Sequence, residues 1–558
     1  MIPRKTKFLV TTIVLILVGV AAAAEPAPAP AWTREVPDWA LGTLAFAQIH
    51  SNLDKAGKYA GKLLPNSGEL AKQFIMSNVF NLPVSAGIKN GPAVVYLLDP
   101  ISTGLREETA FILPVSDANT VKTDLINVFG APTTADDVMT FTMLQAQPKP
   151  DKTLLVKFVK DHLLAAPSKV LLNKLEGVLG NANPAPAAGD DSRSDVRAAL
   201  KIATFKKGFQ GLFELSAMQG AEMAAQDPNQ AEKLKSQIKD AIETLWQVDT
   251  LEAHLTLSDD GGAMALEIQA RPLRGSPLAA QFQKPATPTS GAMLKVLPGG
   301  APISAAWNLE GVPLIGTLRA QLDAEARNNA APTEIPRAVL DVLKFADGEG
   351  AMSFSGKESE GTCIAVAVHV SDPAKTGASL RAALEKVQAG VNLKPMPPDE
   401  HAGVAIQKYK VPSAKEPSFI DYALVGSDLI ASAGTAELGV VEKAIDNDKT
   451  PPTPDPKAAL AGADDACAKV AIKLVSLTKL VLTNLPGMPN AADTAKATAG
   501  IPDATVTFSI RQNTKLAGFR IDLPAEAALA GYMLYQHLQN AIVSAPGAVP
   551  APAPAPTP

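Results

Sequence analysis

Six histidines are the residues best suited to metal binding or acid-base chemistry, and each stands alone in the sequence. They are His50, His162, His254, His369, His401 and His537. A helical zinc site places two histidines four residues apart with a glutamate beside the first, and neither that spacing nor Cys-x-x-Cys occurs. His254 falls on the polar side of an alternating strand, which predicts a solvated side chain. The sequence therefore assigns no metal ligand and no cofactor-binding residue.

Two short motifs could suggest a serine nucleophile. Ser236-Gln-Ile-Lys239 and Lys375-Thr376-Gly377 match two of the three motifs of penicillin-binding serine enzymes, but no Ser-x-Asn lies between them. Lys375 follows Asp372 at the expected start of a helix, whereas that chemistry needs its lysine on a strand. No Gly-x-Ser-x-Gly elbow and no phosphate-binding glycine loop occurs. No catalytic residue is assigned.

Paired carboxylates could do acid-base work if a cleft held them together. Such pairs occur at Glu107-Glu108, Asp136-Asp137, Asp190-Asp191, Asp259-Asp260, Asp399-Glu400 and Asp464-Asp465. Their neighbours are turn-forming residues, which favours solvated loops or caps. Asp259-Asp260-Gly261-Gly262 has a calcium-like composition but lacks the later ligands of an EF-hand loop, so we expect a hairpin turn.

Cys363 and Cys467 are the two cysteines of the chain. A disulfide between them is one alternative in an oxidising compartment. The other is that each is a small buried apolar residue in a strand, which their distance in sequence favours.

Composition excludes several partners. The chain has 558 residues and a formal charge of −5. Removal of residues 1–24 takes away Arg4, Lys5 and Lys7 and leaves 48 basic against 56 acidic residues, or −8. A mildly acidic protein has no electrostatic attraction to nucleic acid or anionic lipid. An aromatic content of 5% argues against a stacking site for sugars or bases.

The N-terminus predicts export. Arg4, Lys5 and Lys7 precede an apolar run from Phe8 to Val20, and Ala22-Ala23-Ala24 supplies a cleavage site before Glu25. We expect a periplasmic or extracellular protein after cleavage near Ala24. The alternative is an uncleaved anchor, because Phe8 to Ala24 is near the shortest length that spans a membrane.

Corresponding segments recur along the chain at offsets of 253 to 266 residues, which predicts a tandem duplication. The matched pairs are Ala45–Leu63 with Ala305–Asp323, Val115–Asp117 with Val370–Asp372, His162–Ala166 with Asp428–Ser432, Phe213–Leu215 with Ile472–Leu474, and Leu251–Leu257 with Ala504–Ile510. In the third pair His162 is replaced by Asp428, which suggests an exposed strand end.

The elements within each half predict an α+β fold, an antiparallel sheet with helices on one face. Leu251 to Leu257 alternates apolar and polar residues, and Ala263–Ala270 returns after a turn. Ser116 or Asp117, and Ser371 or Asp372, stand where helix N-caps are expected. Each copy is expected to contain two sub-units.

The predicted organisation follows from these signals. It comprises a signal peptide (1–24), a Pro/Ala-rich linker (25–38), a first half (39–291, sub-units about 39–195 and 196–291), a second half (292–541, sub-units about 292–455 and 456–541) and a Pro/Ala-rich disordered tail (542–558). A further Pro/Ala-rich loop is expected at 182–190.

This plan loosely resembles uncharacterised exported bacterial repeat proteins of the domain-of-unknown-function class. The resemblance rests on the strand Phe111–Asp117, the strand His162–Ala166 and the helix Ser168–Leu179. It implies no activity, no catalytic residue and no cofactor.

Three functions remain open. The first is a non-enzymatic envelope protein whose duplicated module binds or organises a protein or polymer partner, because two copies of a binding face raise affinity through effective concentration. The second is a carrier of an apolar ligand such as lipid, in a groove between sheet and helices. The third is an enzyme whose site has no recognisable motif.

Overall fold

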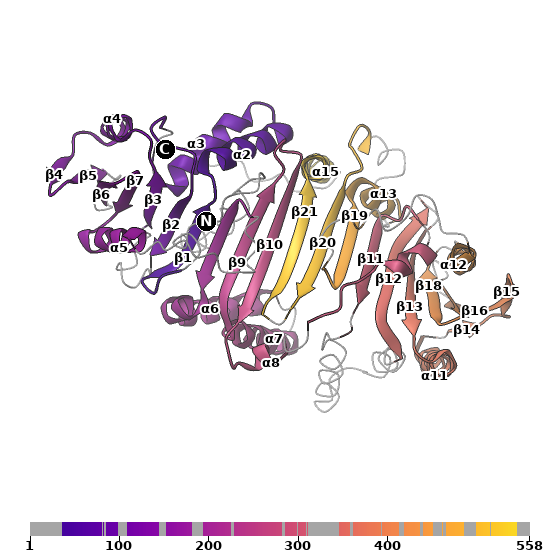
Figure 1. The fold of residues 1–558 in the computed structure, drawn as a ribbon. Coiled ribbons are helices and arrows are strands. Elements are labelled where there is room, and N and C mark those ends of the chain that lie inside the picture. Colours follow the sequence, from indigo (N-terminus) through magenta and orange to yellow (C-terminus); the bar gives the residue numbers. More distant parts are fainter. Residues whose placement is uncertain are drawn as a thin grey trace. The chain divides into compact units, whose positions relative to one another are not determined.

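The computed structural model (Figure 1) places the chain in two compact units. Unit 1 is Met1–Gln283 with Thr514–Arg520, and unit 2 is Lys284–Asn513 with Ile521–Pro558. We describe each unit by itself. The described residues are 36–543 except 81, 83–84, 99–108, 144–151, 181–193, 225–227, 282–284, 298, 309, 311–344, 358–360, 392, 412–417, 436–438, 450–459, 461–464, 485–497 and 514. The predicted signal peptide and the 182–190 loop lie outside them, as do nearly all of the linker and tail.

Ten strands of unit 1 form an antiparallel sheet in the order β4–β5–β6–β7–β3–β2–β1–β8–β9–β10. Their bounds are β1 Ala40–Phe46, β2 Ala93–Leu98, β3 Thr109–Pro114, β4 Thr133–Ala135, β5 Val138–Met143, β6 Lys152–Val159, β7 His162–Ala166, β8 Val196–Lys201, β9 Val248–Leu257 and β10 Ala263–Pro272. Because β1 pairs with both β2 and β8, the sub-units predicted to divide near residue 195 share one sheet.

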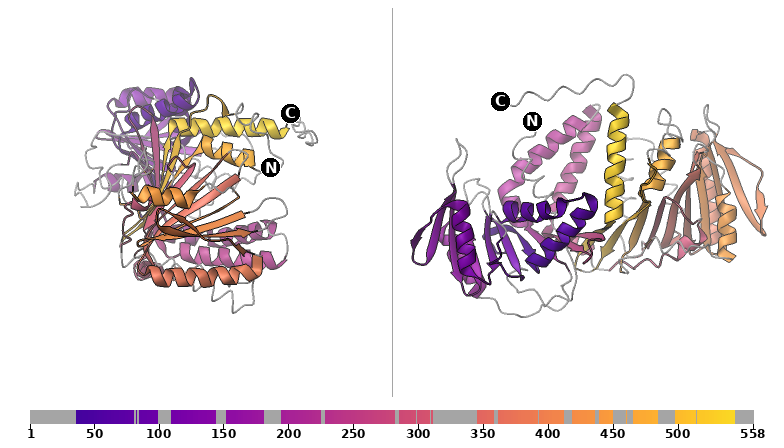
Figure 2. Two further views of the ribbon diagram at one scale, coloured as in Figure 1. Left: turned by 90° about the vertical axis from the view of Figure 1, so that its right-hand side faces the viewer. Right: turned by 90° about the horizontal axis from the view of Figure 1, so that it is seen from above.

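Helices cover both faces of this sheet, not one face as predicted (Figure 2). The unit 1 helices are α2 Ile49–Leu63, α3 Ser67–Val79, α4 Ala118–Phe129, α5 Lys169–Gly180, α6 Ile202–Ala224, α7 Pro228–Leu245 and α8 Pro277–Gln281. On one face Ala45 and Ile112 pack with Leu172 of α5. On the other, Phe46 and Phe111 contact Phe80 at the end of α3, with ring centroids 5.4 and 5.9 Å apart. The sequence signal is that β2 and β3 are almost continuously apolar, which is typical of strands buried on both faces.

One predicted repeat match is wrong. Phe213–Leu215 was matched to a strand, but it lies within α6. The segment that pairs with β1 is instead β8, which immediately precedes α6. A helical spacing of four was present in Phe205, Phe209 and Phe213, whose rings pack together in α6 with Trp246.

In unit 2 an antiparallel sheet has the order β15–β16–β17–β18–β13–β12–β11–β19–β20. The bounds are β11 Ile303–Asn308, β12 Ala346–Lys357, β13 Gly361–Val370, β14 Lys394–Pro395, β15 Asp399–His401, β16 Val404–Val411, β17 Ser418–Val425, β18 Asp428–Gly434, β19 Ala468–Lys473 and β20 Thr505–Gln512. The short β14 also pairs with β16. Strand β11 joins β12 to β19, so the sub-units predicted to divide near 455 also share a sheet.

Helices again lie on both faces. They are η2 Ala292–Val296, α11 Pro373–Val391, α12 Val440–Lys449, α13 Leu474–Asn484 and α15 Ala525–Val543, the last following β21, Ala517–Pro524. On one face Ile430 packs with Leu294 of η2 and Val441 of α12. Its neighbour Leu429 packs on the other face with Leu384 of α11. Within the described residues, no helix has the length and apolarity needed to cross a membrane.

Candidate functional site

The turn between β9 and β10 rests on helix α2 through three lysines. Lys55 forms an ion pair with Asp259, Lys58 Nζ donates to the Asp259 carbonyl at 3.0 Å, and Lys62 Nζ lies 3.3 Å from Asp260 Oδ2. Positions 55, 58 and 62 fall on one face of a helix, which is why one helix can reach the whole turn. We call these contacts the α2–turn seat.

The predicted hairpin at Asp259-Asp260-Gly261-Gly262 is confirmed, since Leu257 of β9 pairs with Met264 of β10. Gly261 has φ +67, and a Cβ there would lie 2.7 Å from the Tyr59 backbone nitrogen of α2. Hydrogen bonds from the Ser258 hydroxyl and the Gly262 N–H hold the pKa of Asp260 well below its usual range. The lysines of α2 balance the charge of these carboxylates.

Two buried polar side chains lie beneath the seat. Asn52 Nδ2 donates to the Asp195 carbonyl at 2.7 Å, and both residues are buried. Asn52 Oδ1 and Asp195 Oδ2 are buried without a hydrogen-bond partner among the described residues. Burial raises the pKa of Asp195 to about 7, against the opposing charge of Lys55. No sequence motif marks this group, because α2 brings its partners from about 140 residues away.

A buried charge network lies on β8, β9 and β10. Glu252 is 2% exposed and accepts from Arg197 Nε at 3.0 Å, with Arg271 Nε also 3.0 Å away. Burial alone would raise the pKa of Glu252, but hydrogen bonds from His254 and Arg197 and the arginine charges hold it well below the usual range. The carboxylate is thus saturated by internal partners, an arrangement suited to structure rather than to proton transfer.

The expectation that His254 is solvated is wrong. Its side chain is 9% exposed, its Nε2 lies 3.1 Å from Glu252 Oε2, and Ser194 Oγ lies 3.1 Å from its Nδ1. The alternation correctly placed His254 and Glu252 on one face of β9, but that face is covered.

The other described histidines each contact a different partner. His162 lies 2.8 Å from Asp161, His369 lies 2.7 Å from Asp428, His401 lies 2.8 Å from Asp446, and His50 Nε2 lies 2.7 Å from the Ile88 carbonyl. His162 and Asp428 open β7 and β18 as expected, but both side chains are partly buried. Nothing is described of the His537 side chain. Where side chains are described, no group of three His, Cys, Asp or Glu residues could hold a metal ion.

The residues of the serine-enzyme motifs belong to different units. Ser236 and Lys239 lie on α7 of unit 1, and Lys375 lies in the first turn of α11 in unit 2. Lys375 pairs with Asp372 at 2.8 Å, as expected for a residue at a helix start.

The remaining acidic pairs are separate. Asp136 and Asp137 form the β4–β5 turn with φ 51 and 60, and Lys169 lies 3.0 Å from Asp136. Asp399 and Glu400 lie in β15, where Asp399 pairs with Lys408 at 3.2 Å. The pairs at 107–108 and 190–191, and Asp464, lie outside the described residues.

Both cysteines are free and buried, which confirms the apolar interpretation. Cys363 lies in β13 and Cys467 immediately precedes β19. Burial raises the pKa of both thiols, so neither is an activated nucleophile.

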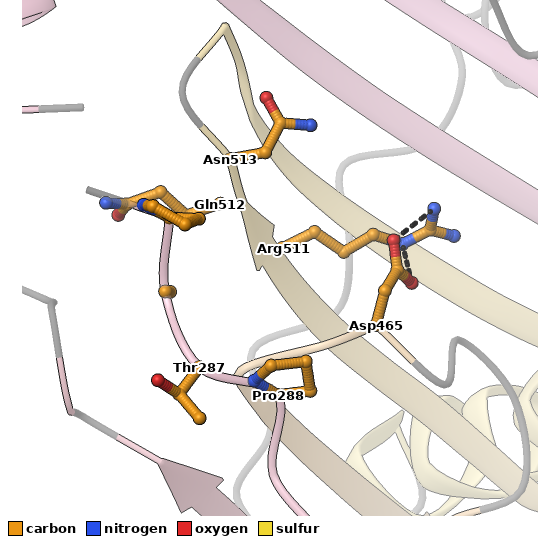
Figure 3. A pocket seen from close by; sticks show the side chains of 8 residues that line it. Thr287, Pro288, Asp465, Arg511, Gln512 and Asn513 are labelled. Carbon is orange, nitrogen blue, oxygen red and sulfur yellow. Dashed lines mark hydrogen bonds and ion pairs between the residues drawn. The ribbon is translucent and has the colours of Figure 1, made fainter. Parts of the chain in front are cut away.

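A small pocket in unit 2 has a volume of about 370 Å³ (Figure 3). One wall is the segment 285–288, and Gln512 and Asn513 form another. The Arg511 and Asp465 side chains face each other, with Nε 3.2 Å from Oδ1. Because Asp465 balances the guanidinium charge, the pocket has no strong preference for an anion.

No protein-family model, curated protein or solved structure matches the chain.

Proposed function

We propose that the chain is a non-enzymatic exported protein of the cell envelope that binds a protein partner through an apolar stripe on helix α3. The observation that carries the proposal is the exposure of Leu70 (65%) and Phe74 (48%). Four residues apart on a helix, they lie on one face. Leucine and phenylalanine exposed side by side on a helix are typical of a docking surface.

The opposite side of α3 explains why this stripe is held outward. Ile75, Met76 and Val79 are buried. α3 also approaches α2 closely, since a Cβ on Gly68 would lie 2.8 Å from the Gly57 carbonyl oxygen. The helix therefore has a fixed inner side and presents Leu70 and Phe74 on a rigid support, which lowers the entropy cost of binding.

Tandem duplication is part of the proposal. Eight strand pairings of unit 1 have a counterpart in unit 2 in the same chain order. They run from β4–β5 and β15–β16 through β1–β2 and β11–β12 to β8–β9 and β19–β20. The agreement includes pairings between strands far apart in sequence, such as β3–β7 with β13–β18 and β1–β8 with β11–β19, which two unrelated domains would rarely share by chance. The stretch of unit 2 that corresponds to α2 and α3 lies largely within residues 311–344, outside the described residues.

The other two functions receive less support. The Glu252 carboxylate, whose pKa is lowered, makes four contacts with three internal partners, Arg197, His254 and Arg271, which suits a structural role better than catalysis. A lipid carrier needs a cavity with mostly apolar walls. The pocket described above has a volume of about 370 Å³, near the lower limit for small-molecule sites, and an ion pair in its wall. The two sheets pack apolar side chains against their helices.

The binding surface is tested by the double variant Leu70→Ser, Phe74→Ser in the full chain. The matched control is Val170→Ser, which removes a side chain of α5 that is 67% exposed. Native mass spectrometry of protein purified from its own envelope should show a protein complex for the wild type and the control, and its loss in the double variant. A complex that survives in the double variant contradicts the proposal, and co-purified lipid would support the carrier.

Export is tested separately by sequencing the N-terminus of the protein recovered from fractionated cells. A mature chain that begins at Glu25 is expected. A chain that retains residues 1–24 in the membrane fraction would support an uncleaved anchor instead.

A further inference from the structure

Beneath the α2–turn seat lies a carboxyl group whose surroundings suit its protonated form. Asp195 is 8% and Asn52 1% exposed. Asn52 Oδ1 and Asp195 Oδ2, which have no hydrogen-bond partner in the part of the chain that the structure describes, are both acceptors while Asp195 is ionised. Protonation converts the Asp195 carboxyl into a donor. Buried acceptors without donors are costly, so the proton removes part of that cost.

The charges around Asp195 favour the same form. From α2 comes Lys55, which is 6% exposed, and from the turn comes Asp259, with which Lys55 is paired. When Asp195 is ionised, the single positive charge of Lys55 faces two carboxylates, Asp195 and Asp259. These three residues then carry a net negative charge. When Asp195 is protonated, the Lys55–Asp259 pair is balanced.

Other charged groups nearby are occupied elsewhere. Lys62 pairs with Asp260 on the outside of the turn, and Lys58 donates to a backbone carbonyl. On β8 and β9, His254 and Arg197 are engaged by Glu252. None of these therefore compensates an ionised Asp195 in the way that Lys55 does.

We propose that the α2–turn seat is a proton-controlled latch, which holds the β9–β10 turn on α2 more tightly when Asp195 is protonated than when it is ionised. The latch would make this corner of unit 1 open more readily as the surroundings become alkaline. It does not depend on the binding surface proposed for α3.

The direction of the pH dependence follows from linkage. Burial raises the pKa of Asp195 from 3.8 to about 7, the Lys55 charge and the Leu257 N–H oppose the rise, and the Asp259 charge adds to it. A carboxyl whose pKa is higher in the closed state binds its proton more tightly there. The stabilisation is complete below pH 3.8 and is lost as the pH rises through about 7.

Hydrogen exchange of the full chain at pH 5 and pH 8, corrected for intrinsic rates, measures the latch. In peptides that cover 258–262, the opening constant of the wild type should rise at least about tenfold between these pH values, with an upper bound on the order of 100-fold from a tenfold change per pKa unit. Asp195→Asn, which cannot ionise, should remove the rise.

Asp260→Asn is the matched control for the pH dependence, because Ser258 and Gly262 hold the pKa of Asp260 far below this pH window. The substitution alters the contact with Lys62 and so changes the opening constant itself, but the rise between pH 5 and pH 8 should remain as in the wild type. A wild type without the rise, or an Asp195→Asn variant that retains it, overturns the proposal. If Asp195→Asn does not fold, Lys55→Gln provides the second test. Loss of the Lys55 charge should move the midpoint of the rise to higher pH, and an unchanged or lower midpoint is evidence against the latch.

Discussion

The sheets of the two units fill corresponding positions in different ways. In unit 1, Thr43 of β1 lies between Ala199 and Tyr96 on its neighbouring strands. In unit 2, Ser304 of β11 lies between Ala471 and Ser353. A buried tyrosine of one unit thus corresponds to a buried serine of the other.

What covers the two positions differs accordingly. Tyr96 packs against Trp39, with ring centroids 4.9 Å apart. In unit 2 the segment just before the first strand instead forms η2, whose Met293 and Leu294 pack among small residues such as Ala365. A large strand residue thus packs against a tryptophan in unit 1, whereas in unit 2 small strand residues pack against the larger side chains of η2.

The charge network shows the same contrast. Glu252 pairs across β8 and β9 with Ala199, and Thr507 pairs across β19 and β20 with Ala471. By strand pairing Thr507 is therefore the counterpart of Glu252, so the predicted match of Leu251–Leu257 with Ala504–Ile510 is two residues out of register. Unit 1 thus has a buried carboxylate with two arginines where unit 2 has a hydroxyl. The strands pair in the same order in both units. The buried charges of Glu252 and its two arginines are therefore not needed to set that order.

The largest expected effect comes from Tyr96→Ala. Removal of this buried ring should lower the free energy of unfolding by about 3–5 kcal/mol, as for other aromatic-to-alanine changes in cores. Urea unfolding of the full chain measures the loss. Ser353→Ala is the matched control. Because Ser353 Oγ is buried without a hydrogen-bond partner among the described residues, its removal should cost almost nothing. A comparable loss in both variants would show that the two positions are not filled differently.

The next effect is expected for Glu252→Ala. Breaking a buried ion pair by removing one partner leaves the other charges poorly compensated, so the free energy of unfolding should fall by about 3 kcal/mol. Thr507→Val, which changes one buried hydroxyl for a methyl group, should cost less than about 1 kcal/mol. Equal losses by urea unfolding would mean that the network of unit 1 has no special role in stability.

Local features such as helix caps and strand faces were predictable from the sequence. Which faces of the sheets are covered by other elements was not. An N-cap is expected at Ser116 or Asp117 and at Ser371 or Asp372, because a cap depends on a few adjacent residues. In both helices the aspartate forms the capping bonds. His254 was assigned to the correct face of its strand. The error was to take that face as solvated, because alternation tells which residues share a face and not what packs on it.

The contacts of the α2–turn seat could not be predicted from the sequence for a related reason. The turn at 259–262 was recognised, but its partners Lys58 and Lys62 lie about 200 residues earlier on α2. Only the pairing of β1 with β8, and of β8 with β9, brings that helix to the turn. No local pattern carries such information, so the raised pKa of Asp195 has no sequence signature.

The smallest effect is expected from the two N-caps, which also tests how alike the units are locally. Asp117 accepts from Asn119 N at 2.9 Å and Asp372 from Lys375 N at 3.0 Å. Asp117→Ala and Asp372→Ala should each increase hydrogen exchange in the first turn of α4 or α11 by a similar, modest factor.

In acid, each cap variant and the wild type should show the same hydrogen exchange in the first turn of the helix. A side-chain hydrogen bond, from Thr120 in one unit and Lys375 in the other, lowers the pKa of each aspartate. A lowered pKa means that the cap stabilises above pH 3.8 and that this contribution is lost as the pH falls through the pKa of the folded state. If only one of the two variants exchanged like the wild type in acid, the starts of α4 and α11 would not be equivalent. The sheets would then be alike in strand order without being alike in the contacts that begin their helices.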